Sequence, residues 1–192
     1  MQQPPKIKRF TYADYCVWPD YENWELIDGT LFTKTPSPSF AHQSILLELA
    51  VQLKDFLDGT QCRVFVAPFD VRLNAAGEDD TVVQPDILVV CDKTKLANGK
   101  SVAGVPELII EILSPFTGDY ERITKRDLYE RKGVPEYWIV DPEKKTLTTF
   151  ILGDDAAYFA CTYDHEATAV PVEVLEGCEI NIAVAFVAAE AF

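Results

Sequence analysis

Two apolar segments that each carry one acidic residue constrain the fold of this chain more than any other feature. Residues 82–90 contain Asp86, and residues 106–113 contain Glu111. Both segments are rich in Val, Ile and Leu, which is typical of buried strands. A carboxylate in a buried strand is costly to desolvate unless a partner neutralises it. The pattern therefore predicts that Asp86 and Glu111 share a partner, and a divalent cation, which takes oxygen ligands, fits best.

The geometry of strands makes such a shared site possible. Side chains two residues apart in a strand point to the same face, so Asp86 and Glu111 can converge if the two strands are neighbours. Mg²⁺ or Mn²⁺ needs only one or two carboxylates, a backbone carbonyl and water. The carbonyl of Ile112 is the candidate third ligand. Pro85 lacks a backbone donor, which suits an edge or bulge where the strand changes direction.

A charged segment at residues 119–132 reads as a helix that follows the second strand. Lys125 and Tyr129 are four residues apart and therefore share one helix face. A lysine near a metal-bound phosphate could orient a water molecule and stabilise developing negative charge. Arg122 and Arg126 on the same helix are candidates for a local positive patch.

These residues resemble the PD-(D/E)XK nuclease signature. Pro85-Asp86 followed by Glu111-Ile112-Leu113 matches its acidic part, but Leu113 stands where the usual Glu-x-Lys lysine would be. Some branches of that superfamily carry the lysine on the following helix. The resemblance therefore implies that Lys125 is the migrated lysine, and Lys125-x-x-x-Tyr129 is similar to the helix motif of such branches.

The chain as a whole resembles one bacterial family, the Uma-two restriction-endonuclease-like proteins, over about residues 10–190. The matching motifs are Trp24-Glu25-Leu26-Ile27-Asp28-Gly29, His42, Asp70-Val71-Arg72-Leu73, Gln84-Pro85-Asp86, Glu111-Ile112-Leu113-Ser114-Pro115, Lys125-x-x-x-Tyr129 and Gly133-Val134-Pro135-Glu136-Tyr137-Trp138-Ile139-Val140-Asp141-Pro142. Each short motif alone is weak, but their combination in this order is specific. The resemblance implies a restriction-endonuclease-like fold, a divalent metal and hydrolysis of phosphodiester bonds.

Three further residues are candidates for supporting roles. Asp70 is a candidate metal ligand or a support for Lys125, and its alternative is a strand-start acid in a turn. Glu25 could reach the site from a hairpin strand, or form a cross-strand pair on a sheet surface. His42 opens a long helix, where a lone histidine is more often a cap or packing residue than a ligand.

The central residues also have simpler interpretations. Asp86 and Glu111 could each pair with an arginine or lie at exposed strand ends, although acids within apolar strands favour a site. Lys125 could be a solvated helix lysine. Tyr129 could be a core aromatic residue with a tethered hydroxyl.

The predicted fold class is α/β or α+β, a restriction-endonuclease-like core in which helices flank a mixed central sheet. A tail at 1–10 precedes a single domain at 11–192. Besides the central segments, we expect a helix at 11–18, a hairpin at 24–33, a helix at 40–57, a broken strand or hairpin pair at 62–66 and 69–73, a strand at 136–141, an exposed strand meander at 146–152, 158–163 and 169–174, and a closing helix at 182–192. Asp28-Gly29 is a strong type I′ turn signal.

Net charge, apolar runs and cysteine pattern limit which partners and which cellular compartment we expect for this protein. The formal net charge of −14 over 192 residues repels polyanions, so attraction to a nucleic acid has to be local or come from bound metal. No apolar run approaches the roughly 20 residues of a membrane helix, and no apolar segment of a secretory signal follows the basic N-terminus. The five cysteines are scattered without a CxxC motif, which predicts reduced thiols in a cytoplasmic protein.

Three functions are compatible with these residues. The leading hypothesis is a metal-dependent endonuclease, in which Asp86 and Glu111 bind Mg²⁺ or Mn²⁺, Lys125 assists catalysis, DNA is the substrate and a homodimer cuts both strands. The alternative is a catalytically silent protein that uses the same fold as a binding module. Metal-free glycoside chemistry by two carboxylates ranks lower, because no aromatic-rich sugar platform adjoins them in sequence.

Overall fold

The computed structural model describes residues 8–18, 24–33, 38–96, 98–114 and 120–190. Four predicted features fall partly outside the described residues: residues 1–7 of the tail predicted at 1–10, the loop residues 36–37, the helix start at Asp119 and the chain end at 191–192. The side chain of Arg122 lies outside them as well.

A six-stranded mixed sheet forms the centre of the molecule. In spatial order its strands are β11 (Tyr158–Asp164), β10 (Thr146–Leu152), β9 (Glu136–Asp141), β8 (Leu108–Ile112), β6 (Ile87–Val90) and β3 (Arg63–Val66). β8 and β9 are parallel, and the other neighbours are antiparallel. Every residue of β6, β8 and β9 is buried. The near-continuous apolar sequence of these strands reflects burial on both faces.

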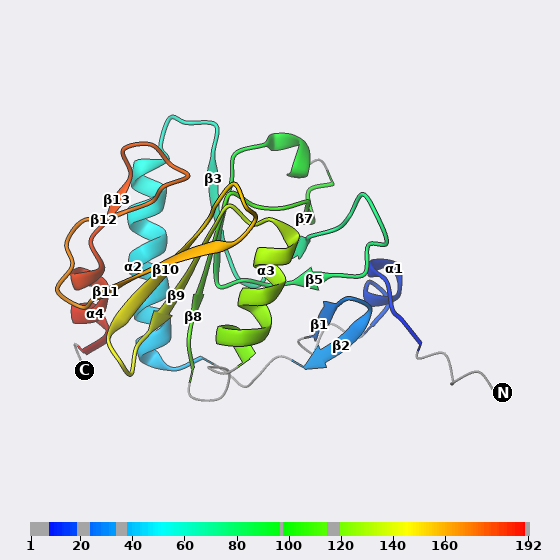
Figure 1. Ribbon diagram of the computed structural model, residues 1–192, viewed down its shortest axis with the longest axis horizontal. Helices are drawn as coiled ribbons and strands as arrows, with labels where there is room; N and C mark the ends of the chain where they lie inside the picture. The colour runs from blue at the N-terminus through cyan, green and yellow to red at the C-terminus, as the bar shows by residue number, and fades with distance from the viewer. Residues whose placement is uncertain (1–7, 19–23, 34–37, 97, 115–119, 191–192) are drawn as a thin grey trace.

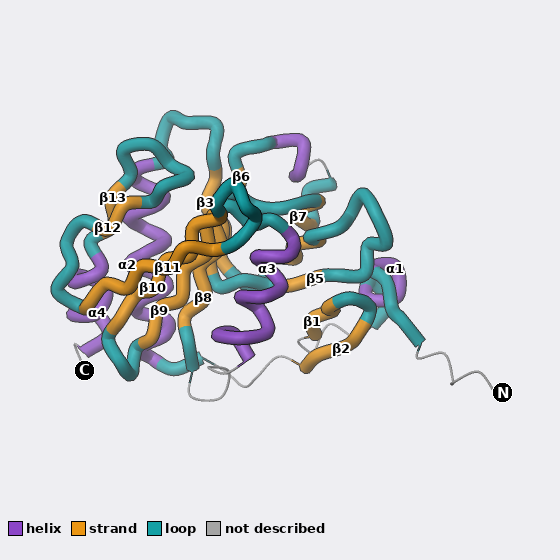
Figure 2. Tube along the Cα trace, in the orientation of Figure 1, coloured by secondary structure: helices purple, strands orange, loops and turns teal. Residues whose placement is uncertain are grey.

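A second sheet lies to one side of the first (Figures 1 and 2). In spatial order its strands are β2 (Thr30–Thr33), β1 (Trp24–Ile27), β5 (Val82–Val83), β4 (Asp70–Arg72) and β7 (Ser101–Ala103). β1 and β2 form the predicted hairpin. Asp28 and Gly29 connect them with φ angles of 48° and 75°, as a type I′ turn requires.

Helices cover the two faces of the six-stranded sheet unequally (Figure 1). α2 (Phe40–Phe56) and α4 (Ile182–Glu190) pack on one face, where they share an apolar cluster with Ile110 of β8. On the other face, α3 (Arg126–Lys132) and the second sheet share a cluster with Ile109. Shorter helical turns are α1 (Tyr12–Tyr15), η1 (Lys93–Leu96) and the π-helical η2 (Tyr120–Lys125), which leads into α3. None of the helices in the described ranges is long and apolar enough to cross a bilayer.

Two segments that read as continuous strand regions are divided between the sheets. The predicted hairpin pair at 62–66 and 69–73 is wrong, because β3 belongs to the six-stranded sheet and β4 to the five-stranded one. Residues 82–90 split in the same way into β5 and β6, with Pro85 and Asp86 between them. Because Pro85 has no N–H to donate, the ladder ends there and the chain turns toward the other sheet.

The two ends of the chain also differ from prediction. The helix at 11–18 contracts to α1, which the Asp14 carboxylate caps by accepting from the Thr11 N–H at 2.9 Å. β10 and β11 pair as predicted. The prediction of a third meander strand at 169–174 is wrong. Residues 170–171 form β12 (Val170–Pro171), which pairs with β13 (Glu179–Ile180) in a separate two-stranded sheet. Buried Val170 and Val172 draw this segment onto the α2–α4 side of the core.

The prediction of reduced thiols is wrong for one pair of cysteines. Cys62 and Cys91 form a disulfide with Cα atoms 3.8 Å apart. The reason is the antiparallel pairing of β3 with β6, in which Arg63 lies opposite Val90. Residues 62 and 91 are therefore the next pair along the same ladder. Cys16, Cys161 and Cys178 are free thiols.

Glu136 makes the stability of the fold depend on pH. Its fully buried carboxylate accepts from Trp138 Nε1 at 2.6 Å and from the Val174 N–H at 2.9 Å. Burial nevertheless raises its pKa to about 7 from 4.5. The folded state therefore binds more protons than the unfolded state between these values. The stability that Glu136 contributes is complete below the unfolded pKa and is lost as the pH rises through the folded one.

We expect Glu136→Gln to remove this dependence. The free energy of unfolding of the wild type, relative to the variant, should fall by about 3 kcal/mol as the pH rises across the window between the two pKa values. Urea unfolding of both proteins at a series of pH values measures the difference. Parallel pH profiles for the two proteins would contradict the role given to this carboxylate.

Candidate functional site

The pairing of β6 with β8 brings the two predicted acids together. Ile87 lies opposite Ile110 in the ladder, so Asp86 and Glu111 come next to each other at its end. The Asp86 N–H donates to Glu111 Oε2 at 3.4 Å. Asp86 lies in the segment that connects β5 of one sheet to β6 of the other, and Glu111 is in β8.

Asp86 is held by groups from two other elements. Its Oδ2 accepts from the Ile112 N–H at 2.8 Å and lies 3.0 Å from Nε2 of His42. His42 is in the first turn of α2, where its N–H donates to the capping Ser39 Oγ. Burial raises the pKa of the Asp86 carboxyl, but His42, the Ile112 amide and Lys125 lower it by more, so it lies below its usual value. The Asp86 side chain is 13% exposed, and its carboxylate is available as an anion.

Glu111 lies deeper and forms the centre of an ionic cluster. Its Oε1 accepts from Lys125 Nζ at 2.7 Å and from the Tyr129 hydroxyl at 2.8 Å. Lys125 Nζ also lies 2.9 Å from Glu25 Oε1 of β1. The side chains of Glu25, Glu111 and Lys125 are each 1–2% exposed. One lysine therefore bridges two buried carboxylates that come from different sheets.

The helix geometry lets Lys125 and Tyr129 both donate hydrogen bonds to Glu111. Lys125 ends the π-helical turn η2, and α3 begins immediately after it. Such wide turns are rare and often occur at functional sites. Burial and the Glu111 charge raise the pKa of the Tyr129 hydroxyl well above its usual value. The hydroxyl therefore stays protonated and donates to Glu111.

Asp70 connects to this cluster through Gln84. The Gln84 N–H donates to Glu25 Oε1 at 3.1 Å, and its Nε2 donates to Asp70 Oδ1 at 2.9 Å. The Tyr15 hydroxyl donates to the same Asp70 oxygen at 3.1 Å. Asp70 was predicted to bind metal or support Lys125, and its connection to Lys125 runs through Gln84 and Glu25. Tyr15 and Gln84 were not predicted as site residues, although Gln84 directly precedes Pro85-Asp86.

The structure decides between several alternative environments that the sequence left open for the charged residues. A solvated Lys125 and a surface pair for Glu25 are both wrong, because both side chains are buried in one cluster. The cationic partner of Glu111 is Lys125 rather than an arginine. Arg126 is partly exposed, and its guanidinium pairs with the neighbouring Asp127 rather than with Asp86 or Glu111.

The donor set fits the divalent cation that the nuclease resemblance implies. Asp86 and Glu111 offer hard oxygen ligands side by side, and the Ile112 carbonyl follows Glu111 directly in the chain. Among the described residues, no three side chains of His, Cys, Asp or Glu gather closely enough to hold an ion. A backbone carbonyl and water would have to complete the coordination, which is usual for Mg²⁺.

Comparisons with known proteins show the family of this chain. Residues 11–185 match the model of the Uma2 family, which is described as "putative restriction endonuclease". The chain belongs to the Uma2 family. The family resemblance inferred from the sequence motifs is thereby confirmed.

Two individual proteins are similar to this Uma2 chain. An uncharacterized protein of Synechocystis sp., slr1290, is 24% identical over 153 residues, which cover 78% of each chain. A crystal structure from Anabaena variabilis, described as a putative nuclease belonging to DUF820, superposes with a TM-score of 0.74. The match covers 94% of this chain and 99% of that one at 20% identity. The predicted fold class, mixed sheets flanked by helices in a nuclease-like arrangement, is confirmed.

Proposed function

We propose that this Uma2 protein is a divalent-metal-dependent endonuclease that hydrolyses phosphodiester bonds of nucleic acid. One observation carries the proposal: the β6–β8 pairing sets Asp86 beside Glu111, and Lys125 Nζ lies 2.7 Å from Glu111. An acid pair can hold a metal ion, and an adjacent lysine can stabilise the negative charge that develops on a phosphate. The description of the family and that of the Anabaena protein support a nuclease.

Each residue of the cluster has a role in this proposal. A bound Mg²⁺ or Mn²⁺ supplies Lewis-acid polarisation and lowers the pKa of a bound water. Asp86, Glu111 and the Ile112 carbonyl would hold the ion. Lys125 would place a positive charge beside the reacting phosphate and orient the attacking water.

The other residues act as positioning residues. His42 fixes the Asp86 carboxylate through Oδ2, and Tyr129 fixes Glu111 through Oε1. Glu25 holds Lys125 from the opposite sheet. These contacts restrict the rotamers of the ligands and of the lysine before any substrate binds, which favours catalysis.

DNA as the substrate and a homodimer as the active form belong to the same proposal. Cleavage of both strands of a duplex calls for two sites, and two-fold symmetry is the common way to provide them. The net charge of −14 opposes long-range attraction of DNA. Binding should therefore depend strongly on the metal, because the ion locally offsets the acidic site.

A catalytically silent binding module is the second candidate. The observation that favours it is the full engagement of Glu111, whose two oxygens already accept hydrogen bonds from Asp86, Lys125 and Tyr129. An ionic cluster of this kind can serve to join the two sheets without any metal. Mn²⁺ binding separates the two functions, because a purely structural cluster needs no ion.

The test combines cleavage with calorimetry. The purified protein is incubated with supercoiled plasmid, linear duplex, single-stranded DNA and RNA in Mg²⁺ or Mn²⁺, with EDTA in parallel. We expect cleavage of at least one substrate, its loss in EDTA, and Mn²⁺ binding by calorimetry. No cleavage together with no Mn²⁺ binding would favour the silent module, and cleavage that survives EDTA would contradict metal dependence.

A further inference from the structure

The Cys62–Cys91 disulfide joins an edge strand to the strand that leads to Asp86. β3 is the last strand of the six-stranded sheet, and β6 is its neighbour. The disulfide lies at one end of their ladder. At the other end, the Ala67 N–H donates to the Asp86 carbonyl at 3.0 Å. The covalent link and the candidate metal ligand therefore lie at opposite ends of the same short strand pair.

A cavity opens directly beside the disulfide. Its volume is about 480 Å³, and Gln61, Cys91, Asp92, Lys93 and Glu107 line it. This volume is within the range of small-molecule sites. Cys91 lines the cavity, whereas Cys62, the residue before β3, is not among its lining residues. A small thiol in the cavity can therefore approach the sulfur of Cys91.

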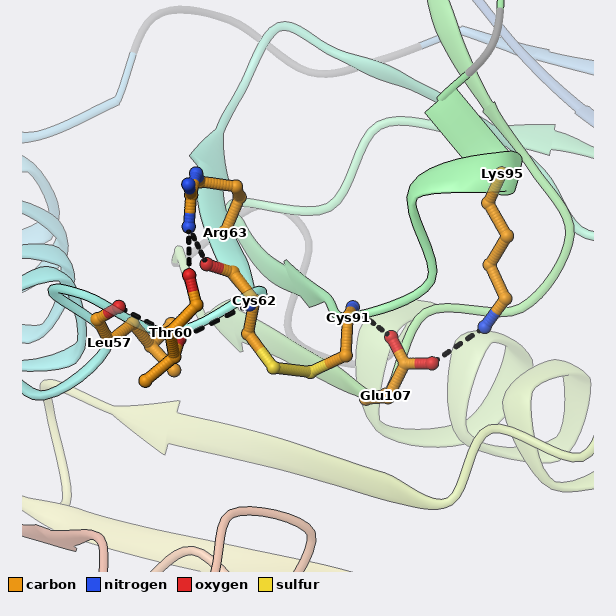
Figure 3. Close-up of a disulfide and its surroundings, with 7 residues drawn as sticks. All are labelled: Leu57, Thr60, Cys62, Arg63, Cys91, Lys95 and Glu107. Carbon is orange, nitrogen blue, oxygen red and sulfur yellow. Dashed lines mark hydrogen bonds and ion pairs between the residues drawn. A yellow bond between two sulfur atoms is a disulfide. The ribbon is translucent and has the colours of Figure 1, made fainter.

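The two cysteines are held in different ways (Figure 3). The Cys91 N–H donates to Glu107 Oε2 at 2.8 Å, and Lys95 Nζ holds the other oxygen of Glu107 at 2.6 Å. Cys62 directly precedes β3 and is partly buried against the core, and its N–H donates to Thr60 Oγ1 at 3.2 Å. Without the disulfide, β6 keeps its anchor at Cys91. The start of β3 is then held by its pairing with β6, by the packing of Cys62 and Val64 against the core, and by surface hydrogen bonds.

We propose that Cys62–Cys91 is a thiol-exchange site that accepts a low-molecular-weight thiol in this cavity. The thiolate of the small thiol attacks Sγ of Cys91, the Sγ–Sγ bond breaks, and Cys62 leaves as a thiolate that takes a proton from solvent. A second thiolate attacks the sulfur of the bound small thiol and releases Cys91, which is protonated in turn. Two small thiols are oxidised to their disulfide, and the protein disulfide is reduced to two thiols.

Reduction removes the covalent link at the start of the edge strand β3 and lets this strand open more readily. Because β3 lies at the sheet edge and reaches Asp86 through Ala67, its opening loosens the backbone on one side of the candidate metal site. The consequence for Asp86 rests on the proposed nuclease function, but thiol exchange does not. The experiment therefore measures thiol chemistry and amide exchange rather than cleavage.

The experiment uses the full-length protein with Cys16→Ser and Cys161→Ser, which removes the two exposed free thiols. The protein is equilibrated in glutathione buffers of increasing reduced fraction, alkylated, and analysed by mass spectrometry. We expect folded protein to gain two alkylated cysteines reversibly. Amide hydrogen exchange at Arg63, Phe65 and Ala67, whose N–H groups face β6 in the antiparallel ladder, should become about tenfold faster in the reduced form, because local opening of an edge strand costs little.

Two single variants in the same background test the direction of attack. Cys62→Ser leaves the cavity-lining Cys91, and Cys91→Ser leaves Cys62. With oxidised glutathione, Cys62→Ser should form the mixed disulfide about tenfold faster than Cys91→Ser, because access governs such exchange. Equal rates, or a disulfide that is reduced only after unfolding in urea, would overturn the proposal. Unchanged amide exchange on reduction would overturn the easier opening of β3.

Discussion

Replacing Asp86 by asparagine is expected to lower metal-dependent cleavage about 10³-fold while the protein stays folded. Asparagine keeps an oxygen that can accept from the Ile112 N–H, which Asp86 Oδ2 does at 2.8 Å. It removes the negative charge on the more exposed of the two candidate ligands. Single-turnover cleavage in Mn²⁺ measures the rate, and calorimetry should show that Mn²⁺ binding weakens in parallel.

Asp127→Asn is the matched control for this substitution. Asp127 lies on α3 near Lys125, but its carboxylate is 53% exposed and pairs with Arg126. The variant has the same change of net charge without touching the acid pair. Equal cleavage rates and equal Mn²⁺ affinities for the two variants would exclude Asp86 as a metal ligand.

Local sequence patterns predicted the strands well but not the sheets to which they belong. Residues 82–90 read as one apolar run, and the structure divides it into β5 and β6 in different sheets. A strand pattern reports burial and periodicity within its own segment. The choice of partner strand is a long-range property, because it depends on segments distant in the chain. Pro85 was the one local sign of the change of direction.

The charged residues of the candidate site could be identified from the sequence because burying charge is costly. Asp86 and Glu111 stood out as acids in apolar strands, and Lys125 stood out through its spacing in the family motif. Gln84 and Tyr15 were missed, because a neutral amide and a hydroxyl in ordinary contexts give no comparable signal. Their importance emerges only from the hydrogen bonds that join Asp70 to Glu25.

The disulfide was missed for a related reason. An odd number of scattered cysteines speaks against a disulfide framework, but it does not distinguish one cysteine from another. Only the register of β3 against β6 shows that Cys62 lies opposite Cys91. Knowing that register requires knowing that the two strands pair, which the sequence pattern did not reveal.

Lys125→Met is expected to lower the free energy of unfolding by about 3–5 kcal/mol, because breaking a buried ion pair leaves uncompensated charge. Lys125 Nζ lies within 2.9 Å of carboxylate oxygens on both Glu25 and Glu111, and all three side chains are buried. Methionine keeps most of the volume but none of the charge. Urea unfolding monitored by circular dichroism measures the loss.

Two further variants separate loss of charge from loss of packing. Lys132→Met removes a lysine that lies 3.3 Å from the partly exposed Asp28, and a pair of this kind is worth about 1 kcal/mol or less. Adding Glu25→Gln to Lys125→Met removes one of the two carboxylates left unpaired, so part of the lost stability should return. If Lys125→Met costs no more than Lys132→Met, the buried lysine does not neutralise this acid pair. If the double variant recovers nothing, the loss comes from packing, and the electrostatic account of the cluster is wrong.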